Sequence, residues 1–115
     1  MKEKVFLSGR ITGDLRNYKQ KFNEVADKLT AEGYIVLNPA TLPLGLTYAD
    51  YARICHAMIE AADTLLLLPG YEHSKGALLE KDYARYIGKE VEVYAHGKPV
   101  VNCKRPVWDD DDCKW

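Results

Sequence analysis

Glu80 is the side chain of this sequence best placed to do chemistry, because it falls on the apolar face of a predicted helix. The segment 74–88 predicts that helix, with Ser74 as its N-cap and Gly88 as its C-terminal stop. The residues three and four positions away are small or aromatic, and none is basic: Gly76, Ala77, Tyr83 and Ala84. A carboxylate that faces the interior of a fold without a local cation is either paired across the fold or reserved for chemistry.

Length and composition describe one ordinary globular domain. The chain has 115 residues, 47% of them hydrophobic, and a formal net charge of −1, so no basic field favours binding to a nucleic acid polymer. The longest apolar run, 64–68, is too short to span a bilayer, and the N-terminus leads directly into a strand. We therefore expect neither a membrane segment nor a signal peptide. The domain is expected over residues 1–102, followed by an acidic C-terminal tail over 103–115.

The cysteines and aspartates do not have the spacing of a metal site. Cys55, Cys103 and Cys113 are odd in number and far apart, which favours a reducing cytoplasm. The run of aspartates at 109–112 is typical of a solvated end, because adjacent side chains point apart. We therefore expect no metal and no cofactor.

Hydrophobic periodicity predicts alternating strands and helices. The first helix carries an apolar stripe that a glycine closes: Leu15, Tyr18, Phe22, Val25, Leu29 and Gly33. Helices over 48–62 and 74–88 follow. Strands are expected over 5–7, 34–37, 64–68 and 90–94, with a short fifth strand over 99–101. The strand 64–68 is the most hydrophobic and should be central, whereas the alternation in 90–94 favours a one-sided or edge strand.

This order of elements predicts an α/β fold with a parallel sheet and right-handed crossovers. In such sheets a ligand binds beyond the carboxyl ends of the strands. Three loops meet at that edge, over residues 8–13, 38–47 and 69–74. They are the expected place for a binding site.

Two of these loops suit an anion. Gly9 and Gly13 let the backbone approach a ligand, and Arg10 and Thr12 add a cation and a hydroxyl that suit a phosphate. The start of the helix 74–88 offers Ser74, Lys75 and free N–H groups at the positive end of its dipole. Two such loops at one sheet edge favour a nucleotide over an uncharged ligand.

The motif Ser-Gly-Arg-Ile-Thr-Gly at 8–13, followed by the segment 74–80, resembles the nucleoside 2-deoxyribosyltransferase-like superfamily. The loop 38–46 and the segment 68–72 further resemble a small branch found in phage and bacterial genomes. The resemblance covers about residues 4–93 and leaves out the acidic tail.

The resemblance implies a flavodoxin-like parallel sheet of four to five strands with helices on both faces, usually in homo-oligomers. It implies that Glu80 is the nucleophile that attacks the anomeric carbon of the sugar. It also implies that Ser74 contacts a 5′-phosphate, because nucleotide N-hydrolases of the family have a serine at the matching place. The expected substrate-binding residues are Ser8, Gly9, Arg10, Ile11, Thr12, Gly13, Asn38, Cys55, Gly70, Ser74 and Gly76.

Two positions depart from the pattern of the family. Phe6 stands where the family commonly has a tyrosine, and Cys55 stands where it commonly has an aspartate that assists the leaving base. A thiol is a poor acid at its usual pKa of about 8.5. His56 replaces it only if the helix register shifts by one residue, and Tyr48 and Tyr51 are further sources of hydroxyls.

Three hypotheses follow. The chain is an N-glycosidase or deoxyribosyltransferase-like enzyme acting on a nucleoside 5′-monophosphate, a protein that binds a nucleotide in the same pocket without cleaving it, or a structural protein in which Glu80 forms an internal ion pair.

Overall fold

The computed structural model describes residues 3–11, 15–95 and 98–103, with Ala95 and the segment 98–103 described by their backbone. The strands are β1 (Lys4–Ser8), β2 (Ile35–Leu37), β3 (Thr64–Leu67), β4 (Glu90–Ala95) and β5 (Lys98–Cys103). The helices are α1 (Tyr18–Ala31), α2 (Tyr48–Ala61) and α3 (Lys75–Tyr86), with short 3-10 turns η2 (Pro39–Thr41) and η3 (Tyr71–His73). The expected loop residues Thr12 and Gly13 and the aspartate run lie outside the described residues.

The five strands form one sheet in the order β2-β1-β3-β4-β5. The first four strands are parallel, and β3 lies at the centre as predicted. The fifth strand is antiparallel to β4, because the two residues between them are too few for a crossover. Of the two alternatives for 90–94, a one-sided or an edge strand, the edge strand was therefore wrong, since β4 lies between β3 and β5.

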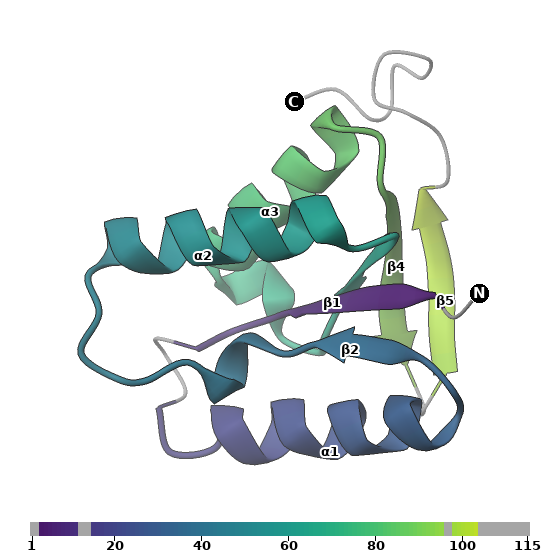
Figure 1. Ribbon diagram of the computed structural model, residues 1–115, viewed down its shortest axis with the longest axis horizontal. Coiled ribbons are helices and arrows are strands. Elements are labelled where there is room, and N and C mark those ends of the chain that lie inside the picture. Colours follow the sequence, from purple (N-terminus) through teal and green to yellow (C-terminus); the bar gives the residue numbers. More distant parts are fainter. Residues whose placement is uncertain (1–2, 12–14, 96–97, 104–115) are drawn as a thin grey trace.

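Helices cover both faces of the sheet, with α1 on one side and α2 and α3 side by side on the other (Figure 1). Side chains of β1 alternate between the two resulting cores. Val5 and Leu7 pack towards α1, whereas Phe6 packs with Cys55 and Ala84 on the α2 and α3 side. The same alternation turns Ser8 towards α2 and α3.

The first helix begins later than its apolar stripe suggests. It starts at Tyr18 with Asn17 as N-cap, and Leu15 lies in the preceding turn with 64% of its surface exposed. The inclusion of Leu15 in the buried stripe was therefore wrong: its spacing fits the helical period, but the residue precedes the first helical turn. Tyr18, Phe22 and Leu29 are buried as predicted.

The helix that carries Glu80 has the predicted ends. The Ser74 hydroxyl accepts a hydrogen bond from the backbone N–H of Ala77 over 3.1 Å, and Gly88 adopts a left-handed φ of +85° after the last turn. Ala77 and Ala84 are its buried residues. Small side chains at these positions let α3 lie close to the sheet.

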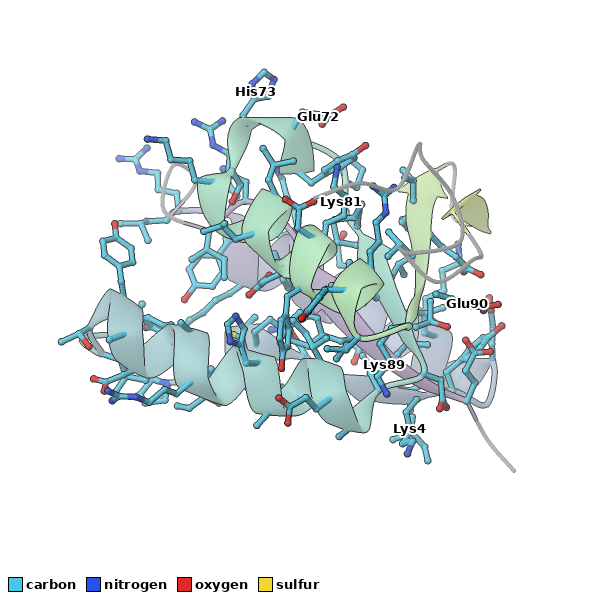
Figure 2. All side chains as sticks on the ribbon, turned by 90° about the horizontal axis from the view of Figure 1, so that it is seen from above. Lys4, Glu72, His73, Lys81, Lys89 and Glu90 are labelled. Carbon is cyan, nitrogen blue, oxygen red and sulfur yellow. The ribbon has the colours of Figure 1, made fainter. Side chains whose placement is uncertain are left out.

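Figure 2 shows the two ends of the molecule. Lys4 and Glu90, at the starts of β1 and β4, lie at one end with Lys89. Glu72 and His73 belong to η3 and lie at the other end, where the parallel strands finish. No helix in the described part of the chain is long and apolar enough to cross a membrane.

Gly9 is required for close packing. A Cβ at this position would lie 3.1 Å from the Cβ of Leu68 and 3.3 Å from the ring of Phe22. We expect Gly9→Ala to lower the free energy of unfolding by about 1–3 kcal/mol, because both neighbours are buried and must shift. Urea denaturation measures this.

Gly76 is the matched control for that experiment. The atom nearest to a Cβ added at Gly76 would be the Ser74 Oγ, at 3.9 Å. Gly76→Ala should raise the stability by up to about 1 kcal/mol, since alanine favours a helix. Equal stability of the two variants would contradict the packing role of Gly9.

Candidate active site

The Glu80 carboxylate joins a helix to the central part of the sheet. The Ser8 hydroxyl, at the carboxyl end of β1, donates a hydrogen bond to Glu80 Oε1 over 2.7 Å. Ser8 is fully buried and Glu80 is half-buried. The side chain that the sequence singles out therefore lies beneath the carboxyl end of the sheet, at the edge where ligands bind in parallel folds.

Cys55 on α2 provides the second contact. Its buried thiol is hydrogen-bonded to the Glu80 side chain. Burial, the negative charge of Glu80 and this hydrogen bond together raise the pKa of the Cys55 thiol to about 12. The thiol therefore stays protonated at neutral pH and donates a hydrogen bond to the Glu80 carboxylate.

Burial raises the pKa of Glu80 above its ordinary value, and the hydrogen bonds from Ser8 and Cys55 oppose that shift. Within the described residues, none of the groups that shift this pKa is a cation. The hypothesis of an internal ion pair is therefore not supported by the groups around Glu80. A carboxylate that accepts hydrogen bonds from two neutral donors is not neutralised by them. Its negative charge can therefore stabilise a positive charge that develops on a ligand beside it.

A cleft of about 410 Å³ opens at the same edge of the sheet, on the α1 side. It lies beside the ends of β1 and β3, where the chain continues from β1 to β2 on one side and from β3 to β4 on the other. Ligands bind at this point in sheets of this topology. Six of its lining residues are Arg10, Lys21, Phe22, Leu68, Gly70 and Tyr94. Arg10 and Gly70 were both predicted to bind substrate, and the cleft brings them together; Glu80 does not line it.

Several predicted binding residues make contacts within the protein. Ser8 is bonded to Glu80, and Ile11 packs against the core on the α1 side. The Asn38 side chain accepts a bond from the Ala40 N–H over 3.0 Å and donates one to Asn23 over 2.9 Å. Asn38 therefore shapes the loop after β2.

The start of α3 is open to a ligand. Ser74 is half-buried and caps the helix through its oxygen, which leaves its hydroxyl proton able to donate. Gly76 is exposed, and Lys75 beside it is exposed as well. The positive end of the helix dipole and these groups remain suited to an anion.

His56 does not replace Cys55 beside Glu80. Its ring stacks on Tyr83, with the ring centroids 4.3 Å apart and an interplanar angle of 20°. The Tyr83 hydroxyl donates to Glu60, and this bond raises the pKa of Tyr83. From the sequence, Tyr83 was named only as a neighbour of Glu80, and its contacts with His56 and Glu60 were not predicted. The one available signal was that His56 and Glu60 share one face of α2 at the i, i+4 spacing.

The two other candidate tyrosines lie elsewhere. Tyr51 donates to the carbonyl oxygen of Pro43 over 2.7 Å and fixes the loop before α2. Tyr48 has 78% of its surface exposed. Across the described ranges, no group of three or more metal-binding side chains comes together.

Residues 3–93 match the family described as "Domain of unknown function (DUF4406)", and the chain belongs to that family. No protein of curated function is detectably similar to it in sequence.

Among the solved structures that share the fold are an N-glycosidase and a deoxyribosyltransferase. The CMP N-glycosidase BcmB of Clostridium botulinum is 20% identical, with a TM-score of 0.60 over 82% of this chain and 76% of that one. The 2-desoxiribosyltransferase from Leishmania mexicana is 18% identical, with a TM-score of 0.65 over 90% of this chain and 81% of that one. These similarities confirm the predicted flavodoxin-like fold.

The raised pKa of Glu80 has a consequence for stability. A carboxyl whose pKa is higher in the folded than in the unfolded state stabilises the fold at low pH, and this contribution is lost as pH rises through the folded-state pKa. Glu80→Gln should therefore raise the free energy of unfolding at pH 7–8 by about 0.5–2 kcal/mol, and by less at pH 4. Urea denaturation at the two pH values measures the difference. A loss of about 3–5 kcal/mol at pH 7 would instead indicate a broken ion pair.

The Cys55 thiol reports on the charge of Glu80. Because that charge helps to raise the pKa of Cys55, Glu80→Gln should shift the alkylation of Cys55 by iodoacetamide to lower pH. The measurement uses a background with Cys103 and Cys113 changed to serine. Glu24→Gln, an exposed site on α1, is the matched control. An identical pH dependence in Glu80→Gln and the parent would contradict the contact.

Proposed function

We propose that this protein cleaves the N-glycosidic bond of a nucleoside or deoxynucleoside 5′-monophosphate, with Glu80 as the nucleophile. The observation that carries the proposal is the half-buried Glu80 carboxylate, held at the carboxyl edge of the sheet by Ser8 and Cys55. The fold it shares with a CMP N-glycosidase and a 2-desoxiribosyltransferase supports the general class of reaction.

In this reaction a Glu80 oxygen forms a bond to the anomeric carbon of the sugar while the bond from that carbon to the base nitrogen breaks. The bonding electrons leave with the base, which takes up a proton from water. A water molecule then attacks the anomeric carbon, displaces the carboxylate and releases the sugar phosphate. In a transferase, the nitrogen of a second base takes the place of that water.

The two departures from the family pattern bear on this chemistry. Phe6 brings no hydroxyl, but Ser8 lies two positions further along on the same face of β1, and its hydroxyl donates a hydrogen bond to Glu80. Cys55 is too weak an acid to protonate the base at neutral pH, since its pKa is about 12. We infer that turnover favours bases that leave readily without an acid from the protein.

The phosphate would be bound at the start of α3. Ser74 supplies a hydroxyl, Lys75 a charge, and the helix its free N–H groups. Arg10, exposed after β1, lies at the same edge of the sheet and adds a second cation. A free nucleoside lacks the group that these residues recognise.

Base release from a panel of mononucleotides and nucleosides, followed by chromatography, tests the proposal. The wild type should release base faster from monophosphates, and Glu80→Ala should reduce the rate by at least about a thousandfold. The rate should also fall as pH drops through the raised pKa of Glu80, because the protonated acid is no nucleophile. Ser74→Ala should lower kcat/KM for monophosphates by about tenfold to a hundredfold and leave nucleosides unaffected.

Glu72→Gln, in the exposed η3 turn of the same edge, is the matched control and should keep its activity. Absence of turnover in the wild type, or undiminished turnover in Glu80→Ala, would contradict the proposal.

The weak acidity of Cys55 favours the second candidate, a protein that binds a mononucleotide without cleaving it. Recovery of the unchanged mononucleotide from a stable complex would support that candidate. Light scattering in the same buffer tests the expected homo-oligomer.

A further inference from the structure

The helix that carries Glu80 has few large side chains anchored in the core. Its buried residues, Ala77 and Ala84, bring it close to the sheet. Alanine side chains interlock little with their neighbours, so they do little to fix how far α3 slides or rotates. The position of Glu80 therefore depends on contacts that α3 makes with its neighbours.

Tyr83 makes two such contacts with α2. Its ring stacks on His56 with the centroids 4.3 Å apart, and its hydroxyl donates to Glu60. His56 and Glu60 lie one turn apart on α2, so together they bind the face and the tip of a single tyrosine. We call these three residues the α2–α3 clamp.

The clamp lies directly beside the acid. Tyr83 follows Glu80 by one helical turn, and His56 follows Cys55 in sequence. A shift between the two helices would therefore change the contact of the Cys55 thiol with the Glu80 carboxylate. A nucleophile misplaced by 1 Å loses much of its rate.

We propose that Tyr83 is a positioning residue for Glu80, which fixes α3 against α2 through His56 and Glu60. This proposal rests on the proposed function only in its kinetic consequence, since the contact between Cys55 and Glu80 exists without turnover. The first readout is therefore the alkylation rate of Cys55 by iodoacetamide at pH 8.5, in protein whose other two cysteines are serine.

Tyr83→Leu, which removes both clamp contacts, should raise the alkylation rate of Cys55 by about tenfold, because the two helices separate more often. Tyr83→Phe keeps the stack and should have a smaller effect. Glu60→Leu should match Tyr83→Phe, and combining the two should add nothing further. Glu60→Gln can still accept a hydrogen bond from the Tyr83 hydroxyl, so its alkylation rate should equal that of the parent.

Two controls separate positioning from general loss of stability. Leu29→Val destabilises the core on the α1 side, where Leu29 is buried, and should leave the rate of Cys55 alkylation within about twofold of the parent. Tyr86→Leu removes the other tyrosine near the end of α3 and should do the same. An unchanged rate in Tyr83→Leu, or an equal rise in Leu29→Val, would overturn the proposal.

The second readout is kinetic and applies if the protein turns over a mononucleotide. Tyr83→Leu should then lower kcat by about tenfold with little change in KM, because bound substrate meets a misplaced acid. Glu60→Gln should restore kcat. A change in KM alone would contradict positioning. If no mononucleotide is cleaved, the proposed function fails while the alkylation experiment still decides the role of Tyr83.

Discussion

The arrangement of this protein depends on one carboxylate that is partly removed from water and, among the described residues, has no cation that shifts its pKa. Glu80 comes from α3, the Ser8 hydroxyl from β1 and the Cys55 thiol from α2. Removing a charge from water is costly, and two neutral donors offset only part of that cost. Such an arrangement is a poor way to stabilise a fold and a good way to keep a negative charge available to a ligand.

The rest of the fold serves to bring these three elements together. The alternation along β1 turns Ser8 towards α2 and α3, while Gly9 permits close contact with Leu68 and Phe22 on the other side. Ala77 and Ala84 let α3 approach the sheet, and the α2–α3 clamp limits how it moves against α2. The cleft on the α1 side lies across the ends of β1 and β3 from the acid. Residues from both faces of the sheet therefore form the site, at the edge where the parallel strands end.

Much of this arrangement follows from the sequence. Four parallel strands, the central β3, the ends of α3 and the isolation of Glu80 from neighbouring bases in its own helix all follow from local patterns. The exposure of Leu15 was missed because hydrophobic periodicity does not fix the residue at which a helix begins. The antiparallel direction of β5 was missed because the same periodicity does not fix the direction of a strand in the sheet. The bond from Ser8 to Glu80 spans 72 positions, so only the folded chain reveals it. The pairing of Tyr83 with His56 and Glu60 depends likewise on the relative placement of two helices.

The most direct test of the central claim is a ¹³C NMR titration of the side-chain carboxyl carbons of glutamate, with Glu80→Gln used to assign the resonance. Glu80 should titrate above its ordinary pKa of 4.5, because burial outweighs the hydrogen bonds from Ser8 and Cys55. Titration at or below that value would show that the carboxylate is well solvated or paired with a cation. The account of a charge held ready at the sheet edge would then be wrong.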